Sequence, residues 1–78
     1  GLLLTSETKT LLGKVYAGFT IRDAENGGTI YQCPDLYLVK DLASISWGPE
    51  TDSVLLTQKD GSSVTYVRTG DRWEKAVQ

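Results

Sequence analysis

Carboxylates are the side chains of this chain that could perform acid–base catalysis, because its 78 residues include no histidine and one cysteine. The usual general base and the Ser–His and Cys–His couples are therefore absent. A catalytic carboxylate pair needs desolvation to separate its two pKa values, and a domain of this size has little room for a dry pocket. The available pairs are Asp23 with Glu25, Asp35 with Asp41, Glu50 with Asp52, and Asp60 with Asp71. We predict no catalytic residue and no enzyme; a carboxylate-dependent enzyme is the remote alternative.

Metal and cofactor sites are not indicated either. The oxygen-rich stretches 23–28 and 48–52 lack the spacing of a calcium-binding EF-hand loop and are typical of polar turns. The sequence "NGGT" lacks the glycine spacing and the lysine of a phosphate-binding loop. A structural zinc site would need more cysteine or histidine than the chain has. We expect no metal and no cofactor, and we expect Cys33 to be a buried thiol that packs as a small apolar group.

The charge balance argues against a nucleic-acid partner. Eight basic and ten acidic residues give a net charge of −2, whereas nucleic-acid affinity comes mainly from Lys and Arg on phosphates. The closest approach to a basic cluster is Arg68, Arg72 and Lys75, which we interpret as a solvated edge. Leu2, Leu3 and Leu4 are far too short a run to span a membrane. Nothing in the sequence indicates a cellular compartment.

The last third of the chain predicts a three-stranded meander. A loop of Lys59, Asp60 and Gly61, with Gly61 at positive φ, pairs Leu56 with Val64 and Val54 with Tyr66. We prefer this register to a two-residue Asp60–Gly61 loop, because it gathers the apolar side chains on one face. A second turn at Gly70–Asp71 then places Thr69 opposite Arg72, Arg68 opposite Trp73, Tyr66 opposite Lys75, and Val64 opposite Val77. In this register Arg68 could lie on the Trp73 ring.

Residues 14–23 also alternate as a strand, with Val15, Ala17, Phe19 and Ile21 on one side. A hairpin turn through Asn26–Gly27 would return the chain into a strand at "TIYQC". Gly18 within the first strand indicates a bulge or a close backbone approach.

The remaining segments are less clearly patterned. We expect a strand at 43–47 and leave 35–41 open between a short helix or turn and a strand. Residues 1–13 fit either one helical turn or a strand, and could act as an N-terminal arm or a capping segment. Together these elements predict one all-β domain over 1–78, an antiparallel barrel or sandwich of five to six strands in the SH3-like or OB-like size class.

The meander has two faces of different character, and this difference is the best indication of function. One face gathers the core candidates, and Phe19, Trp47, Tyr66 and Trp73 are all expected on the apolar sides of their strands. The second face carries Leu55, Thr57, Thr65, Val67 and Ala76 rather than the Lys and Glu of a face left in water. It would be covered either by a partner or by the leucines of residues 2–12.

We therefore predict a non-catalytic protein-interaction or assembly module whose partner is another protein or copies of itself. The alternative is a small β-barrel that binds single-stranded nucleic acid or glycan through exposed aromatics. Rings that are amphipathic, such as those of tyrosine, are frequent at interface hot spots. The candidate interface residues are Tyr16, Tyr37, Leu55, Thr65, Val67, Arg68, Arg72 and Trp73.

Overall fold

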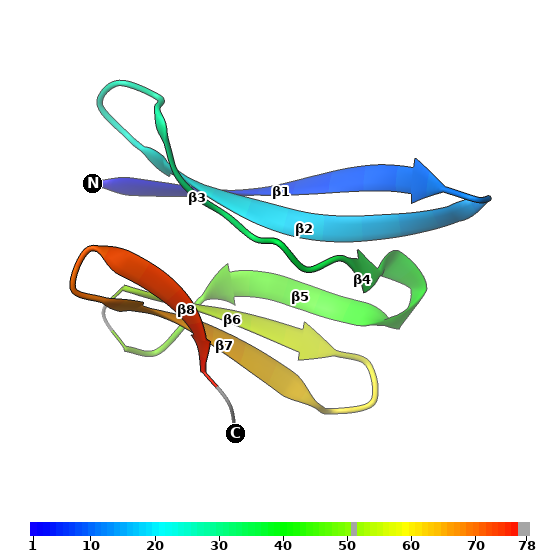
Figure 1. The fold of residues 1–78 in the computed structure, drawn as a ribbon. Helices are drawn as coiled ribbons and strands as arrows, with labels where there is room; N and C mark the ends of the chain where they lie inside the picture. The colour runs from blue at the N-terminus through cyan, green and yellow to red at the C-terminus, as the bar shows by residue number, and fades with distance from the viewer. Residues whose placement is uncertain (51, 77–78) are drawn as a thin grey trace. The chain divides into compact units, whose positions relative to one another are not determined.

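The computed structural model describes residues 1–50 and 52–76. The chain is an all-β protein, as predicted, and its described residues form eight strands and one 3₁₀ turn (Figure 1). The elements are β1 (Leu2–Leu11), β2 (Lys14–Asp23), β3 (Thr29–Gln32), β4 (Tyr37–Leu38), η1 (Val39–Asp41), β5 (Leu42–Trp47), β6 (Ser53–Gln58), β7 (Ser63–Thr69) and β8 (Arg72–Ala76). The strand count exceeds the expected five to six, because residues 2–11 and the short segment 37–38 also pair as strands.

The strands form two antiparallel sheets, each within its own compact unit. Residues Gly1–Lys40 form the first unit, in which β1, β2 and β3 are neighbours in that order and β4 pairs with β2. Residues Asp41–Gln78 form the second unit, whose sheet has the order β5-β6-β7-β8. The second sheet is a meander in which each strand pairs with the one before it (Figure 1).

The register of the β6–β7 hairpin is the predicted one. Leu56 lies opposite Val64 and Val54 opposite Tyr66. The N–H of Gln58 donates to the carbonyl of Ser62 at 2.9 Å, and this hydrogen bond closes the loop. Gly61 has φ of +92°, a conformation that costs a glycine little.

The β7–β8 hairpin is also confirmed. Thr69 lies opposite Arg72, Arg68 opposite Trp73, and Tyr66 opposite Lys75, with Gly70 at φ of +68°. The expected pairing of Val64 with Val77 falls outside the described residues. The predicted strand at 43–47 is also present, as β5.

The first sheet departs from the expectation at its second turn. Five residues, 24–28, lie between β2 and β3, and the backbone pair Asp23 and Gly28 closes a four-residue loop rather than the predicted two-residue turn at Asn26–Gly27. The N–H of Gly27 donates to the carbonyl of Asp23 at 2.8 Å, and the N–H of Asp23 donates to the carbonyl of Gly28 at 2.9 Å. Asp23 and Asn26 side chains each accept from a backbone N–H two residues on, so the wider loop satisfies its own donors.

Two further details of the first sheet differ from the sequence pattern. The irregularity in β2 lies between Ile21 and Arg22, not at Gly18. A Cβ placed on Gly18 would sit 3.5 Å from the carbonyl oxygen of Asp35, which is an ordinary contact distance. In the segment 35–41, the helical part is limited to the three-residue turn η1. Tyr37 and Leu38 pair with β2 as a strand instead.

Each sheet has its own buried apolar residues. The buried apolar side chains are Ala17, Phe19, Ile21, Cys33, Val54, Leu56, Tyr66 and Trp73. This set confirms the predicted buried thiol and most of the predicted core aromatics. Trp47 is an exception at 42% exposed, because it ends the edge strand β5, so its prediction as a core residue was wrong.

Candidate interaction surface

The strand register of the second sheet places the residues of the predicted second face on one side of the sheet. Leu55 lies opposite Thr65, and Thr65 in turn lies opposite Ala76, so the three side chains point to the same side of the sheet. Val67 and Thr57 follow two residues from these positions and share that side. We call this surface, defined by Leu55, Thr57, Thr65, Val67 and Ala76, the Leu55 face.

The two sides of the second sheet differ in burial. Val54, Leu56 and Tyr66 are 0% exposed on the one side. Leu55, Thr65 and Val67 alternate with them along β6 and β7 and remain half-buried. Apolar surface on the Leu55 face therefore stays in contact with water in this chain.

Polar side chains surround the apolar part of the Leu55 face. Leu55, Thr65 and Val67 lie on the two central strands, β6 and β7. The edge strands supply hydroxyl and charged groups on the same side: Ser44 and Ser46 opposite Thr57 and Leu55, Arg72 opposite Thr69, and Glu74 opposite Val67. An apolar centre with a polar rim is the usual anatomy of a protein–protein interface.

The leucines of residues 2–12 belong to the first unit. Leu2–Leu11 is a strand that pairs with β2 in the first unit. Leu12 follows it at the hairpin turn, 102% exposed, and so covers no other residue.

Arg72 belongs to the Leu55 face, whereas Arg68 and Trp73 point to the opposite side of the sheet. Trp73 is 8% exposed and presents little surface to a partner. Nη2 of Arg68 forms an ion pair with Oδ2 of Asp52 at 2.7 Å, and its N–H donates to the carbonyl of the same residue at 3.1 Å. Arg68 thus ties β7 to the loop before β6.

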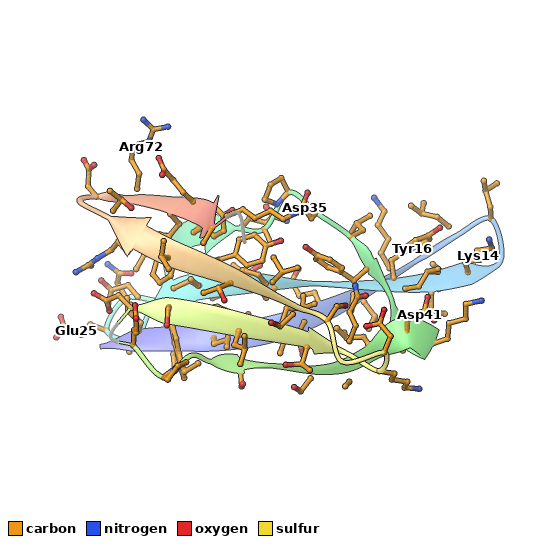
Figure 2. All side chains as sticks on the ribbon, turned by 90° about the horizontal axis from the view of Figure 1, so that it is seen from below. Lys14, Tyr16, Glu25, Asp35, Asp41 and Arg72 are labelled. Carbon is orange, nitrogen blue, oxygen red and sulfur yellow. The ribbon has the colours of Figure 1, made fainter. Side chains whose placement is uncertain are left out.

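Tyr16 and Tyr37 belong to the first unit and point to opposite sides of its sheet. Tyr16 lies opposite Leu38 and Tyr37 opposite Ala17, which are adjacent positions on β2 and β4. Figure 2 shows Tyr16 near Lys14, toward the β1–β2 turn, while Glu25 lies at the other end of this sheet. The two rings therefore do not form one stacking platform.

The first unit also contains a groove that the sequence did not predict. Its volume is about 500 Å³, and its lining includes Glu7, Thr20, Gln32, Cys33 and Leu36. These residues come from three separate segments, so no local pattern connects them. Their polar atoms already contact neighbours: Thr20 Oγ1 donates to Glu7 Oε1 at 3.1 Å, and Cys33 Sγ donates to the Asp35 carbonyl at 3.5 Å.

Tyr31 lies in the same unit and has an altered acidity. Burial is the main cause that raises the pKa of its phenol above the ordinary 10.0, and electrostatic interactions with Cys33, Asp35 and Tyr37 raise it further. The ring packs against Phe19 with 6.1 Å between centroids. Tyr31 is therefore a packing residue that stays neutral at physiological pH.

The Asp60 carboxylate is a structural part of the β6–β7 turn. Asp60 accepts from the Ser62 hydroxyl at 2.6 Å and from its N–H at 2.8 Å, and these bonds lower the pKa of the carboxyl below its ordinary range. The bonds hold the β6–β7 turn. Within 1–50 and 52–76, no group of three or more His, Cys, Asp or Glu could hold a metal ion.

Of the helical residues described, none forms a helix long and apolar enough to cross a membrane. Comparison of the chain with protein families, curated proteins and solved structures finds no match.

Proposed function

We propose that the chain is a non-catalytic protein-interaction or assembly module that binds another protein, or copies of itself, through the Leu55 face. The observation that supports this function is the half-buried position of Leu55, Thr65 and Val67 on neighbouring central strands. A sheet side left in water usually carries charged residues at such positions. Here the charges lie on the edge strand β8 instead.

The composition of the face favours a protein partner over a small molecule. It has an apolar centre and flanking hydroxyl groups, and the two grooves described, one lined by Glu7, Thr20 and Cys33 and the other by Lys14, Val15 and Leu38, both lie in the first unit. An apolar surface with a polar rim gains affinity by excluding water over a wide area rather than by enclosing a ligand.

Binding of single-stranded nucleic acid or glycan has less support. That function needs exposed rings next to positive charge. Trp73 is buried, Arg68 is paired with Asp52, and Tyr16 and Tyr37 point to opposite sides of their sheet.

The test compares two substitutions that each introduce a carboxylate into a strand, at half-buried Val67 and at exposed Ile30. Val67→Asp places the charge in the Leu55 face, and Ile30→Asp places it on β3, where Ile30 is 45% exposed. The immobilised chain and both variants, each checked for folding by circular dichroism, are used to recover proteins from cells that produce it. In parallel, the molar mass of each is measured by light scattering.

We expect a protein, or the chain itself, to associate with the wild type and with Ile30→Asp at equal strength. Association with Val67→Asp should fall by about tenfold or more, because a buried unpaired carboxylate is costly. Equal association of a folded Val67→Asp variant would overturn the proposal.

A further inference from the structure

The long strand β1 is an open edge of the first sheet. Among the described residues it pairs with β2 alone, along all ten positions from Leu2 to Leu11 (Figure 1). Ser6 to Leu11 are all exposed. An exposed edge of this length offers a row of N–H and C=O groups to a further strand.

The hairpin geometry shows which backbone groups point outward. The turn Leu12–Gly13 has two residues, both at positive φ, so the flanking pair Leu11 and Lys14 is hydrogen-bonded. Hydrogen-bonded pairs recur at every second residue, and the bond from the Ala24 N–H to the Gly1 carbonyl at 2.9 Å fits this alternation. The odd-numbered residues of β1 therefore bond to β2, and the even-numbered residues, such as Thr8, direct their backbone groups outward.

We propose that β1 pairs antiparallel with β1 of a second copy of this chain, centred on Thr8 opposite its own counterpart. In this register Glu7 of each copy lies opposite Lys9 of the other, so that two opposite-charge pairs form. Shifting the centre by one residue instead places Glu7 opposite Glu7, or Lys9 opposite Lys9. Like charges directly opposite each other on a sheet are destabilising, so charge selects the register centred on Thr8.

The surroundings of these residues fit the same register. Glu7 receives Thr20 Oγ1 and Arg22 Nη2 at the same oxygen, Oε1, the latter at 3.6 Å, which leaves Oε2 to accept from a lysine. In this register Leu11, the last residue of β1, lies opposite Thr5 of the second copy, so the ladder covers Thr5 to Leu11 of each strand.

This pairing is independent of the Leu55 face, which lies on the other sheet. If both operate, a dimer through β1 would present two copies of the Leu55 face to a partner and raise the avidity. The two surfaces can be tested separately, because Val67→Asp alters only one of them.

The first experiment uses charge exchange on β1. Glu7→Lys and Lys9→Glu each place like charges opposite one another in a homodimer, whereas a mixture of the two variants restores opposite charges in a heterodimer. Light scattering over a concentration series should show a dimer for the wild type, a dissociation constant raised about tenfold or more for each variant, and recovery in the mixture. A wild type that stays monomeric, or variants that dimerise as it does, would overturn the proposal.

The second experiment does not depend on charge. Thr8→Cys and Thr10→Cys are made in a Cys33→Ala chain, whose fold is first checked. Two Thr8 positions in a hydrogen-bonded pair lie roughly 5.5 Å apart between Cα atoms, within disulfide range, whereas two Thr10 positions lie roughly 14 Å apart. We expect mild oxidation to crosslink Thr8→Cys and not Thr10→Cys. Equal crosslinking of both, or of neither, would contradict the register.

Discussion

The two sheets of this chain contrast in how their strands are connected. In the β5–β8 sheet the last three strands are joined by turns of two and three residues, each with a glycine at positive φ. In the first sheet, β1 and β2 are also joined by a two-residue turn, Leu12–Gly13. The rest of that sheet is less regular: β2 and β3 are joined by a longer loop, β2 carries an irregularity, and the two-residue strand β4 pairs with it. Short turns fix the register locally, whereas the second arrangement depends on contacts between segments distant in sequence.

The largest expected effects come from the core of each sheet. Phe19→Ala in the first sheet and Leu56→Ala in the second should each lower the free energy of unfolding by about 3 kcal/mol, because each removes a side chain that is at most 1% exposed. Denaturant titration measures this loss. A loss below about 1 kcal/mol for either residue would show that its packing is not as described.

The same two variants test whether both units unfold as one domain. Units of about forty residues seldom bury enough surface to be stable alone, so we expect a single transition. Reactivity of the Cys33 thiol reports on the first unit and tryptophan fluorescence on the second, since both tryptophans lie there. If Phe19→Ala exposes Cys33 while the fluorescence stays native, the units are separately stable.

A matched pair of glycine substitutions gives an intermediate effect. A Cβ on Gly48 would clash with Oγ of Ser53 in the second unit, whereas one on Gly18 in the first meets only ordinary contacts. We expect Gly48→Ala to cost about 1–3 kcal/mol and Gly18→Ala to lie within about 0.5 kcal/mol of the wild type. Thermal unfolding of both variants decides this, and the reverse order would refute the packing around the two residues.

The β1–β2 turn should be improved by a residue suited to its backbone. Leu12 has φ of +51°, which an L side chain adopts at a cost, and Leu12→Asn should raise the free energy of unfolding by about 1 kcal/mol. The measurement is made at a concentration where the chain is monomeric, so that any contact of Leu12 with a second copy is absent. A loss of stability would mean that Leu12 packs within its own chain.

The smallest expected effects are opposite responses to pH. The raised pKa of Tyr31 favours the neutral phenol in the folded chain, so its contribution is complete below about pH 10 and is lost as the pH rises through the folded value. The lowered pKa of Asp60 favours the carboxylate, so its contribution is present above about pH 4 and is lost as the pH falls. Tyrosinate absorbance, with Tyr31→Phe as the control, measures the ionisation of Tyr31. The stability of Asp60→Asn as a function of pH in acid measures the contribution of Asp60. A Tyr31 that ionises below pH 10, or an unchanged acid limb in Asp60→Asn, would contradict these assignments.

The sequence predicted the parts of the fold that local chemistry determines. The registers of β6, β7 and β8 follow from alternation and from Gly61 and Gly70, and the Leu55 face follows from those registers. The conformation of 35–41 was not predictable, because Tyr37 and Leu38 become a strand only by pairing with β2. The groove near Cys33 was missed for the same reason, since its walls come from distant segments.

The edge strand β1 was left open between a helical turn and a strand. The Leu12–Gly13 step does carry a signal, since glycine at the second position suits a two-residue hairpin. Leucine at the first position hides this signal, because asparagine or glycine is the usual residue there.

The most direct test of the proposed function is an NMR titration of the labelled chain with the protein recovered on it, or with the unlabelled chain when it binds itself. We predict that the signals of Leu55, Thr65, Val67 and Ala76 shift or broaden, while those of Val54 and Leu56, on the buried side of the same strands, change far less. Perturbations confined to residues outside the Leu55 face would contradict the proposal that this face is the contact surface.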